Sequence, residues 1–323
     1  MEALIWLGGD QLTVENIPNP VPQSDETVMT ISLAGICGSD LHAYRGAGGK
    51  RIPPLVLGHE AVGRIVGDDR LFVVFPLLGC HNCKLCASGL ENLCTDRRLL
   101  GLDRPGTFAE EVAVPTSSLV PVPAGLSADI AALTEPLATA LAVFNGVELS
   151  PSTRVAVIGC GSIGLLTIYA AALAGCIVTA TDPIAERRSA AIELGAQNIV
   201  ATADDFEAGT MDLVVDAVGI EATWSAAVRA VRPGGDVAVV GLGQVTGSVE
   251  IGDLVRRGLT IRGSYAYSRD DFAAALAMLA KEPPPASWLE RLPLKEGPTA
   301  FASLANQSSN SIKILLQPAL GRD

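Results

Sequence analysis

Residues 155–164 read VAVIGCGSIG, a β-branched run that ends in glycines at positions 159, 161 and 164. An Ala- and Leu-rich stretch at 165–175 and a second β-like run at 177–181 follow, which is typical of strand, turn, helix and strand. In this context the first glycine permits a tight turn, the second lets a pyrophosphate approach the backbone, and the third lets the helix pack closely on the strand. The pattern predicts a dinucleotide site at a helix N-terminus, formed by Gly159, Gly161, Ser162, Ile163 and Gly164.

The same segment, residues 155–181, carries no charged side chain and is about long enough to cross a bilayer. A membrane span is disfavoured, because the segment breaks into two strand-like runs separated by a glycine cluster and a helix-like stretch. Strands of a parallel sheet that helices cover on both faces are apolar throughout. We therefore expect a buried parallel sheet and no membrane partner.

A carboxylate ends the second strand-like run. Asp182 can accept hydrogen bonds from both hydroxyls of an adenosine ribose, and its charge would repel a 2′-phosphate. NAD(H) is therefore favoured over NADP(H). Arg187 could stack on the adenine or remain a solvated helix cation, and Arg188 could take either role. Cys160 and Cys176 in the same unit are expected to be small buried thiols.

The pattern of the chain changes near residue 138. Before it, short β-like runs separated by Gly and Pro indicate a compact, largely antiparallel β domain. From Arg154 onward, six β-like runs alternate with helical stretches such as EATWSAAVRAVRPGG (221–235), which suits a doubly wound parallel sheet. After Ser264 a helix, a Pro-rich turn and a closing strand, SIKILLQP (311–318), are expected to return to the first domain.

Four cysteines with the spacing C-x2-C-x2-C-x7-C lie in one short segment: Cys80, Cys83, Cys86 and Cys94. Four thiolates satisfy the tetrahedral preference of Zn²⁺ completely, which predicts a closed, structural zinc site. The alternative, a pair of disulfides or free thiols, is disfavoured by the tight clustering.

A second set of metal ligands comes from distant segments. Cys37 and the pair His59-Glu60 offer a thiolate, an imidazole and a carboxylate, which leave room for a water or a substrate oxygen on zinc. This set is interpreted as catalytic. The sequence therefore predicts two zinc ions per chain.

Composition limits the partners of the protein. The 323 residues carry 23 Lys and Arg against 35 Asp and Glu, a formal net charge of −12. No run of Lys and Arg is longer than two, so a nucleic-acid partner is not expected. The N-terminal segment has no basic region followed by a long apolar stretch, so we expect no signal peptide and a cytoplasmic location, whose reducing environment suits thiolate ligands.

Together these motifs carry a family resemblance that extends over nearly the whole chain. The chain is similar to the zinc-dependent medium-chain alcohol dehydrogenase superfamily, closest in motif to its polyol (sorbitol) and threonine dehydrogenase branch. The resemblance is carried by GICGSDLH (35–42), LGHE (57–60), the cysteine lobe, GTFAEEVAVP (106–115), TEPLATAL (134–141) and GCGSIG. It implies an α/β protein in which a GroES-like β-rich catalytic domain, residues 1–137 and 266–323 with a structural zinc lobe at 79–95, accompanies a Rossmann NAD-binding domain at 138–265.

The resemblance also assigns roles around the catalytic zinc. It makes Cys37 and His59 direct ligands, Glu60 a ligand or a nearby carboxylate that exchanges with water, and Glu135 a residue that binds the metal or holds its water. Asp40 would orient His59 through its other ring nitrogen.

A proton path is implied as well. Ser39 would accept the alcohol proton and His42 would pass it to solvent, although a helix-capping serine and an ordinary surface histidine are the plain alternatives. Tyr44, Leu57, Pro76, Phe108, Leu242 and Tyr265 are expected to line the substrate pocket.

The implied activity is that of a zinc-dependent alcohol or polyol dehydrogenase. It would interconvert a secondary alcohol, in a polyol, sugar or amino alcohol, and the corresponding ketone by hydride transfer to or from NAD(H). Two alternatives stay open: a zinc-containing reductase of activated alkenes or imines on the same scaffold, and a non-catalytic nucleotide-sensing protein. We expect a small-molecule substrate and a homodimer or homotetramer.

Overall fold

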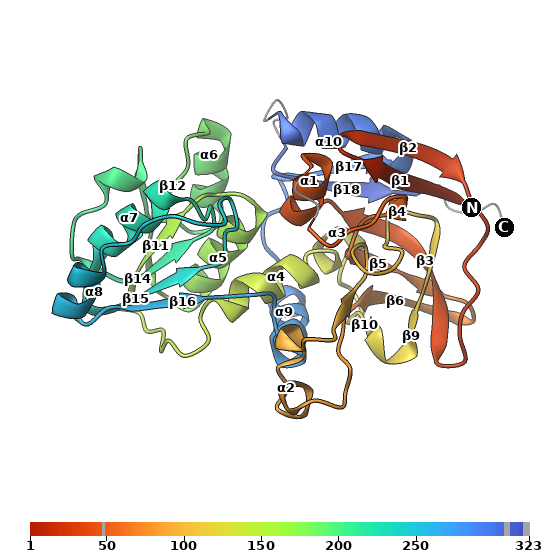
Figure 1. Cartoon of the computed structure of the whole chain (residues 1–323), viewed down its shortest axis with the longest axis horizontal. Helices are drawn as coiled ribbons and strands as arrows, with labels where there is room; N and C mark the ends of the chain where they lie inside the picture. Colours follow the sequence, from red (N-terminus) through yellow and green to blue (C-terminus); the bar gives the residue numbers. More distant parts are fainter. Residues whose placement is uncertain (47–48, 307–310, 319–323) are drawn as a thin grey trace. The chain divides into compact units, whose positions relative to one another are not determined.

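The computed structural model describes residues 1–46, 49–306 and 311–318 (Figure 1). The chain forms two compact units, a β-rich unit of Met1–Glu135 with Ser268–Asp323 and an α/β unit of Pro136–Tyr267. The boundaries expected from the sequence differ from these by two residues. Among the described residues, no helix has the length and apolar character needed to cross a membrane.

The α/β unit is built on a parallel sheet whose strand order is β13-β12-β11-β14-β15-β16. This order confirms the predicted doubly wound sheet. Its strands are β11 (Arg154–Ile158), β12 (Ile177–Thr181), β13 (Asn198–Val200), β14 (Met211–Asp216), β15 (Val231–Val239) and β16 (Thr260–Gly263). Its helices are α5 (Ser162–Leu173), α6 (Ala185–Glu193), α7 (Glu221–Ala230) and α8 (Ile251–Arg257), and α4 (Thr134–Ala142) begins at the unit boundary.

Burial explains the uncharged segment of this unit. In β11, Val155, Ala156 and Val157 are fully buried, with β12 paired on one side and β14 on the other. A central strand that is covered on both faces requires apolar side chains at successive positions.

One expected helix is shorter than the sequence suggested. Residues 231–235 were expected to continue the helix that begins at Glu221, but they open strand β15, and α7 ends at Ala230. Pro233 lacks a backbone N–H and disfavours the helical conformation at Arg232, so the helix stops before this pair.

The β-rich unit contains a seven-stranded sheet in the order β10-β6-β5-β3-β18-β17, with β9 also paired to β3, and a three-stranded sheet β2-β1-β4. Its strands are β1 (Glu2–Gly8), β2 (Gln11–Asn16), β3 (Glu26–Gly35), β4 (Leu55–Val56), β5 (Glu60–Ile65), β6 (Asp68–Val74), β7 (Leu77–Leu78), β8 (Arg98–Leu99), β9 (Glu111–Pro115), β10 (Leu119–Pro121), β17 (Leu289–Pro293) and β18 (Lys313–Gln317). Its helices are α1 (Gly38–Tyr44), α2 (Lys84–Ala87), α3 (Ala128–Ala131), α9 (Arg269–Lys281) and α10 (Gly297–Ala305).

The closing strand returns to the first domain, as the sequence predicted. β18 lies between β3, to which it is antiparallel, and β17, to which it is parallel. Its residues Ile314 and Leu316 join the apolar core that also contains Leu57, Phe108 and Phe301. The end of the chain thereby supports the strand that leads into α1.

Candidate active site and metal centres

The predicted catalytic ligands converge at the ends of two neighbouring strands. Cys37 follows β3, while His59 and Glu60 stand at the start of β5, and the two strands pair with Gly35 opposite Glu60. The ligand atoms of Cys37, His59 and Glu60 all lie within 4.8 Å of one another. His59 and Glu60 are buried. A thiolate, an imidazole and a carboxylate at this spacing suit a zinc ion that retains an open position.

The imidazole of His59 is oriented by its neighbours. Its Nε2 lies 3.5 Å from Ser39 Oγ, and its Nδ1 lies 3.6 Å from Asp40 Oδ1. Asp40 Oδ2 accepts the backbone N–H of Cys37 at 3.1 Å, so this carboxylate both caps α1 and faces the histidine. Nδ1 and Oδ1 are both buried, and neither has a hydrogen-bond partner among the described residues.

The potential in this pocket favours a cation. Burial lowers the pKa of His59, but the negative charges of Asp40 and Cys37 outweigh it and raise that pKa to about 10. A site that stabilises a positive charge so strongly has the potential that a bound zinc ion requires. The donor set and the local charge therefore fit zinc.

A buried lysine faces the glutamate of this cluster. Lys313, the first residue of β18, donates to Glu60 Oε2 and, at 2.9 Å, to the carbonyl oxygen of Ile36. Both side chains of the ion pair are 1% exposed. A Cβ at position 35 would lie 2.2 Å from Glu60 Oε2 and 2.8 Å from Lys313 Cε, so only glycine leaves room for the pair.

Glu135 belongs to the same electrostatic environment. It is buried in the first turn of α4, and its charge contributes to raising the pKa values of both His59 and Lys313. A third carboxylate near the cluster strengthens the preference for a cation.

The two residues of the expected proton path lie on one short helix. Ser39 and His42 are three positions apart on α1, so their side chains share a face. Burial, together with the charges of Arg45 and Arg51, lowers the pKa of His42. A histidine with a lowered pKa is neutral at pH 7 and can accept a proton.

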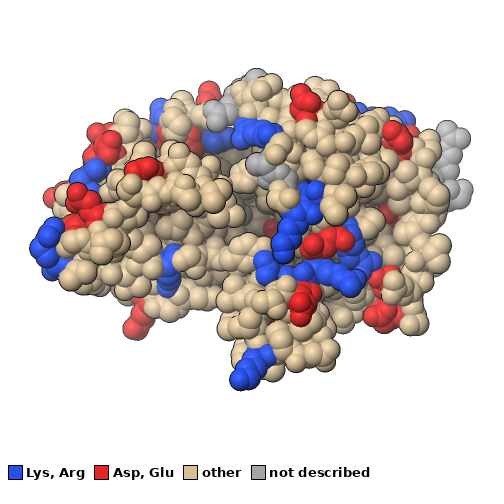
Figure 2. All heavy atoms as spheres, in the orientation of Figure 1, with Lys and Arg blue, Asp and Glu red and all other residues tan. Residues whose placement is uncertain are grey.

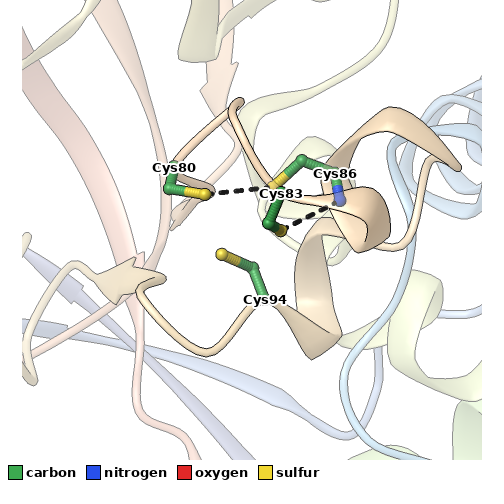
Figure 3. A group of neighbouring side chains, drawn as sticks. All are labelled: Cys80, Cys83, Cys86 and Cys94. Atoms are coloured by element: carbon green, nitrogen blue, oxygen red, sulfur yellow. Dashed lines mark hydrogen bonds between the residues drawn. The ribbon is translucent and has the colours of Figure 1, made fainter.

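The four remaining predicted ligands form a second cluster (Figure 3). Their sulfur atoms lie within 4.8 Å of one another, and Cys80 and Cys86 are separated by 4.0 Å. Zn–S bonds of about 2.3 Å in a tetrahedron place sulfur atoms about 3.8 Å apart, so the cluster fits zinc. All four cysteines are free thiols, which excludes the disulfide alternative. Glu91 links this lobe to α9 through Arg269 at 3.0 Å.

The glycine motif has the predicted geometry. Gly159 has φ +90°, and a Cβ on Gly164 would lie 1.8 Å from the Gly159 carbonyl oxygen. A Cβ on Gly161 would meet nothing within 4 Å, which leaves space at the start of α5. The open N-terminus of this twelve-residue helix, which has no side-chain cap, suits a pyrophosphate.

Asp182 lies directly beside this motif. Its carboxylate accepts the backbone N–H groups of Cys160 at 2.8 Å and Ile184 at 2.9 Å, and Arg187 lies 3.7 Å away. Each carboxylate oxygen keeps a further lone pair for a ribose hydroxyl. Arg188 donates instead to the carbonyl oxygens of Asp182 and Pro183, which separates the roles of the two arginines. Cys160 and Cys176 are buried, as predicted.

Sequence reasoning missed two residues and misplaced two others. Lys313 and Arg51 were not singled out, although a lone cation in the apolar run SIKILLQP is a usable signal for a buried ion pair. Leu57 and Phe108 were expected to line the substrate pocket. Both are fully buried in the core, where Phe108 packs edge-on against Phe301, so they belong to the core beneath the site.

Comparisons with known proteins agree with this geometry. Residues 23–124 match the alcohol dehydrogenase GroES-like domain, and residues 162–281 match the zinc-binding dehydrogenase family. L-galactonate-5-dehydrogenase of Escherichia coli K12 is 31% identical over 302 residues, 87% of this chain and 88% of its own. Sorbitol dehydrogenase of Bacillus subtilis is 30% identical over 268 residues, 75% of each chain. Among solved structures, acetophenone reductase from Geotrichum candidum in complex with NAD has a TM-score of 0.88 and 28% identity, covering 98% of this chain and 96% of that one.

Proposed function

Because the chain belongs to the zinc-dependent medium-chain alcohol dehydrogenase superfamily, we propose that its Cys37, His59 and Glu60 cluster is the catalytic zinc site of a secondary-alcohol dehydrogenase. Membership confirms the fold, the zinc and NAD(H) cofactors and the general activity expected from the sequence. The observation that carries the site assignment is the contrast between two clusters. One offers four cysteine sulfurs, which would complete the coordination of a zinc ion, whereas the other offers three ligand atoms with Ser39 Oγ 3.5 Å from His59 Nε2, which would leave one position for a substrate oxygen.

Zinc in the open site would supply a Lewis acid that makes an alcohol hydroxyl more acidic. Ser39 then accepts the hydroxyl proton, and His42, neutral because its pKa is lowered, passes it toward solvent. NAD, with its pyrophosphate at the glycine motif and the N-terminus of α5, would supply the hydride acceptor that turns the alcohol into a ketone. Asp40 Oδ1 lies 3.6 Å from His59 Nδ1, which would leave Nε2 as the ring nitrogen that binds the metal.

The substrate class is a polyol, a sugar or an amino alcohol with a secondary hydroxyl. It is supported by relatives named for galactonate and sorbitol. A panel of such alcohols, screened with NAD by the absorbance of NADH, tests the proposal. If protein that carries zinc in both clusters oxidised none of these alcohols, the proposed function would be contradicted.

NAD is proposed as the preferred dinucleotide, with Arg187 beside the adenosine. The support is the buried Asp182 carboxylate, which keeps lone pairs for ribose hydroxyls and whose negative charge would repel a 2′-phosphate.

A homodimer or homotetramer is also proposed. Strand β16 ends the parallel sheet, and within the described residues it pairs only with β15, so its outer edge has free backbone groups. Exposed apolar side chains occur near it on Ile251, Val255 and Ile261. Light scattering on the purified protein decides the oligomeric state. A cytoplasmic location is proposed because all seven cysteines are free thiols, five of which belong to the two clusters that suit a metal.

A further inference from the structure

Arg51 lies within the catalytic cluster although no motif predicts it. Its side chain is 5% exposed, and its Nε donates to the Gly101 carbonyl oxygen at 3.0 Å. Its Nη2 lies 3.4 Å from Ser39 Oγ and 3.7 Å from Asp40 Oδ1. One guanidinium therefore contacts both the serine of the proton path and the carboxylate that faces His59.

The anchor of this guanidinium is rigid. Gly101 has φ +69°, and a Cβ on it would lie 2.6 Å from the Gly58 carbonyl oxygen, so the two backbones are in direct contact. Gly58 immediately precedes His59. The carbonyl group that receives Arg51 Nε is thus held against the segment that carries the metal ligand.

From this geometry we propose that Arg51 is the positioning residue of the proton path: it fixes Ser39 Oγ and dictates the direction in which the serine passes its hydrogen. The inference rests on the proposed alcohol oxidation and adds a residue to it. Arginine is a donor only, so Arg51 occupies one lone pair of Ser39 Oγ and can never accept the serine hydrogen. The second lone pair remains for the alcohol proton, and the serine hydrogen must leave toward an acceptor such as His42 or water.

The proton balance follows directly. The alcohol O–H bond breaks as a new O–H bond forms on Ser39 Oγ, and the original serine hydrogen moves to His42 or water. Arg51 keeps all of its protons. Its positive charge stabilises the negative charge that develops on Oγ during the transfer, because hydrogen bonds to charged groups are the strong ones.

The surroundings support a cationic role. Residues 41–54 contain Arg45, Lys50 and Arg51 but no acidic residue, in a chain with a net charge of −12. Figure 2 shows Lys and Arg side chains close together on the face of the β-rich unit, with acidic side chains between them. The lowered pKa of His42, caused by burial and by Arg45 and Arg51, reports the same local potential.

A double-mutant cycle tests the proposal on the zinc-loaded protein with an alcohol that the unmodified enzyme oxidises. Hydride transfer is followed in single turnovers for the unmodified protein, Arg51→Met, Ser39→Ala and the double variant. We expect Arg51→Met to slow hydride transfer by roughly ten- to a hundredfold. In the Ser39→Ala background the same change should cost less than about twofold, because a residue that acts through the serine has nothing left to position.

Three further variants separate positioning from folding and from general charge. Arg51→Lys keeps the charge and should restore part of the rate, and Arg51→Gln replaces Arg51→Met in the cycle if the latter does not fold. Lys50→Met is the matched control, since it removes an exposed neighbouring cation that has no described contact. It should leave the rate unchanged.

The outcomes are distinct. If Arg51→Met slows hydride transfer equally in the presence and in the absence of Ser39, the proposal is overturned. It is also overturned if the slower rate is explained entirely by a fall in zinc content from two ions to one per chain. If the unmodified protein, loaded with both metals, oxidises no alcohol, the proposed function fails and the inference falls with it. If the unmodified enzyme is active and Arg51→Met leaves the rate of hydride transfer unchanged, only the proposed role of Arg51 is contradicted.

Discussion

Replacing Lys313 by Met should destabilise the β-rich unit far more than an ordinary surface change, because Lys313 and Glu60 form an ion pair in which each side chain is 1% exposed. The substitution keeps the length of the side chain but leaves the Glu60 carboxylate buried without its counter-charge, and the Ile36 carbonyl oxygen without its donor. Removing one partner of such a pair costs about 3–5 kcal/mol. That loss corresponds to a fall in Tm of roughly 6–20 °C.

The assay is thermal unfolding followed by circular dichroism, with and without prior dialysis against a chelator that removes the metal of the open site. The full effect is expected in the depleted protein. With zinc present the loss should be smaller, because the ion supplies part of the missing positive charge next to Glu60. Adding Glu60→Gln to Lys313→Met should recover much of the stability, because the uncompensated charge is then gone.

A matched control is Lys295→Met, which removes an exposed lysine paired with Glu2 at 3.1 Å. A surface pair of this kind is worth at most about 1 kcal/mol. If Lys313→Met in the depleted protein cost no more than Lys295→Met, the reasoning would be refuted, since Glu60 would then need no counter-charge.

Four other predictions follow from the two metal clusters and the dinucleotide site. Cys94→Ser should lose one zinc ion and destabilise the cysteine lobe, whereas Cys37→Ser should abolish activity with a milder effect on folding. Metal analysis of both purified variants checks this prediction. A single zinc ion in the fully loaded, unmodified protein would contradict the assignment of two zinc sites. Asp182→Gly should narrow the preference for NAD over NADP in steady-state kinetics, and an unmodified enzyme that prefers NADP would show that Asp182 does not set the choice. Ser39→Ala should lower the rate of hydride transfer by roughly 10²-fold or more and leave the affinity for NAD nearly unchanged, which stopped-flow absorbance would measure. A near-normal rate, under conditions in which the chemical step is rate-limiting, would contradict proton transfer through Ser39. Because burial raises the pKa of Cys160 to about 12, iodoacetamide at pH 8 should leave this thiol unmodified in the folded protein, as peptide mass spectrometry can verify.

The parts of the site that could be predicted from sequence are those encoded locally. The four cysteines of the lobe lie within fifteen residues, and their spacing alone fixes a cluster. The glycine motif is likewise a turn and a helix start, whose geometry depends on neighbouring residues. In both cases the chemistry requires particular residue types at short separations, so the site can be recognised from the sequence without knowledge of the fold.

Long-range partners could not be predicted in this way. Lys313 and Glu60 are 253 positions apart, and their contact depends on β18 entering the sheet beside β3. Arg51 contacts Ser39 while its Nε donates to the carbonyl oxygen of Gly101, a partner 50 positions away that no local pattern records. The length of the helix that ends at Ala230 was overestimated from local composition. The composition of residues 221–235 is helical, but Pro233 stops the helix.

The position of β18 has a consequence for the order of events when the protein is made. Lys313 lies 253 positions after Glu60, so the counter-charge of Glu60 does not yet exist while the strands beside Cys37, His59 and Glu60 are being synthesised. Until then Cys37, His59 and Glu60 belong to a nascent domain whose sheet lacks an internal strand. The open site is therefore completed only after β18 has been made, and a stop upstream of β18 removes both an internal strand of this sheet and the counter-charge of Glu60.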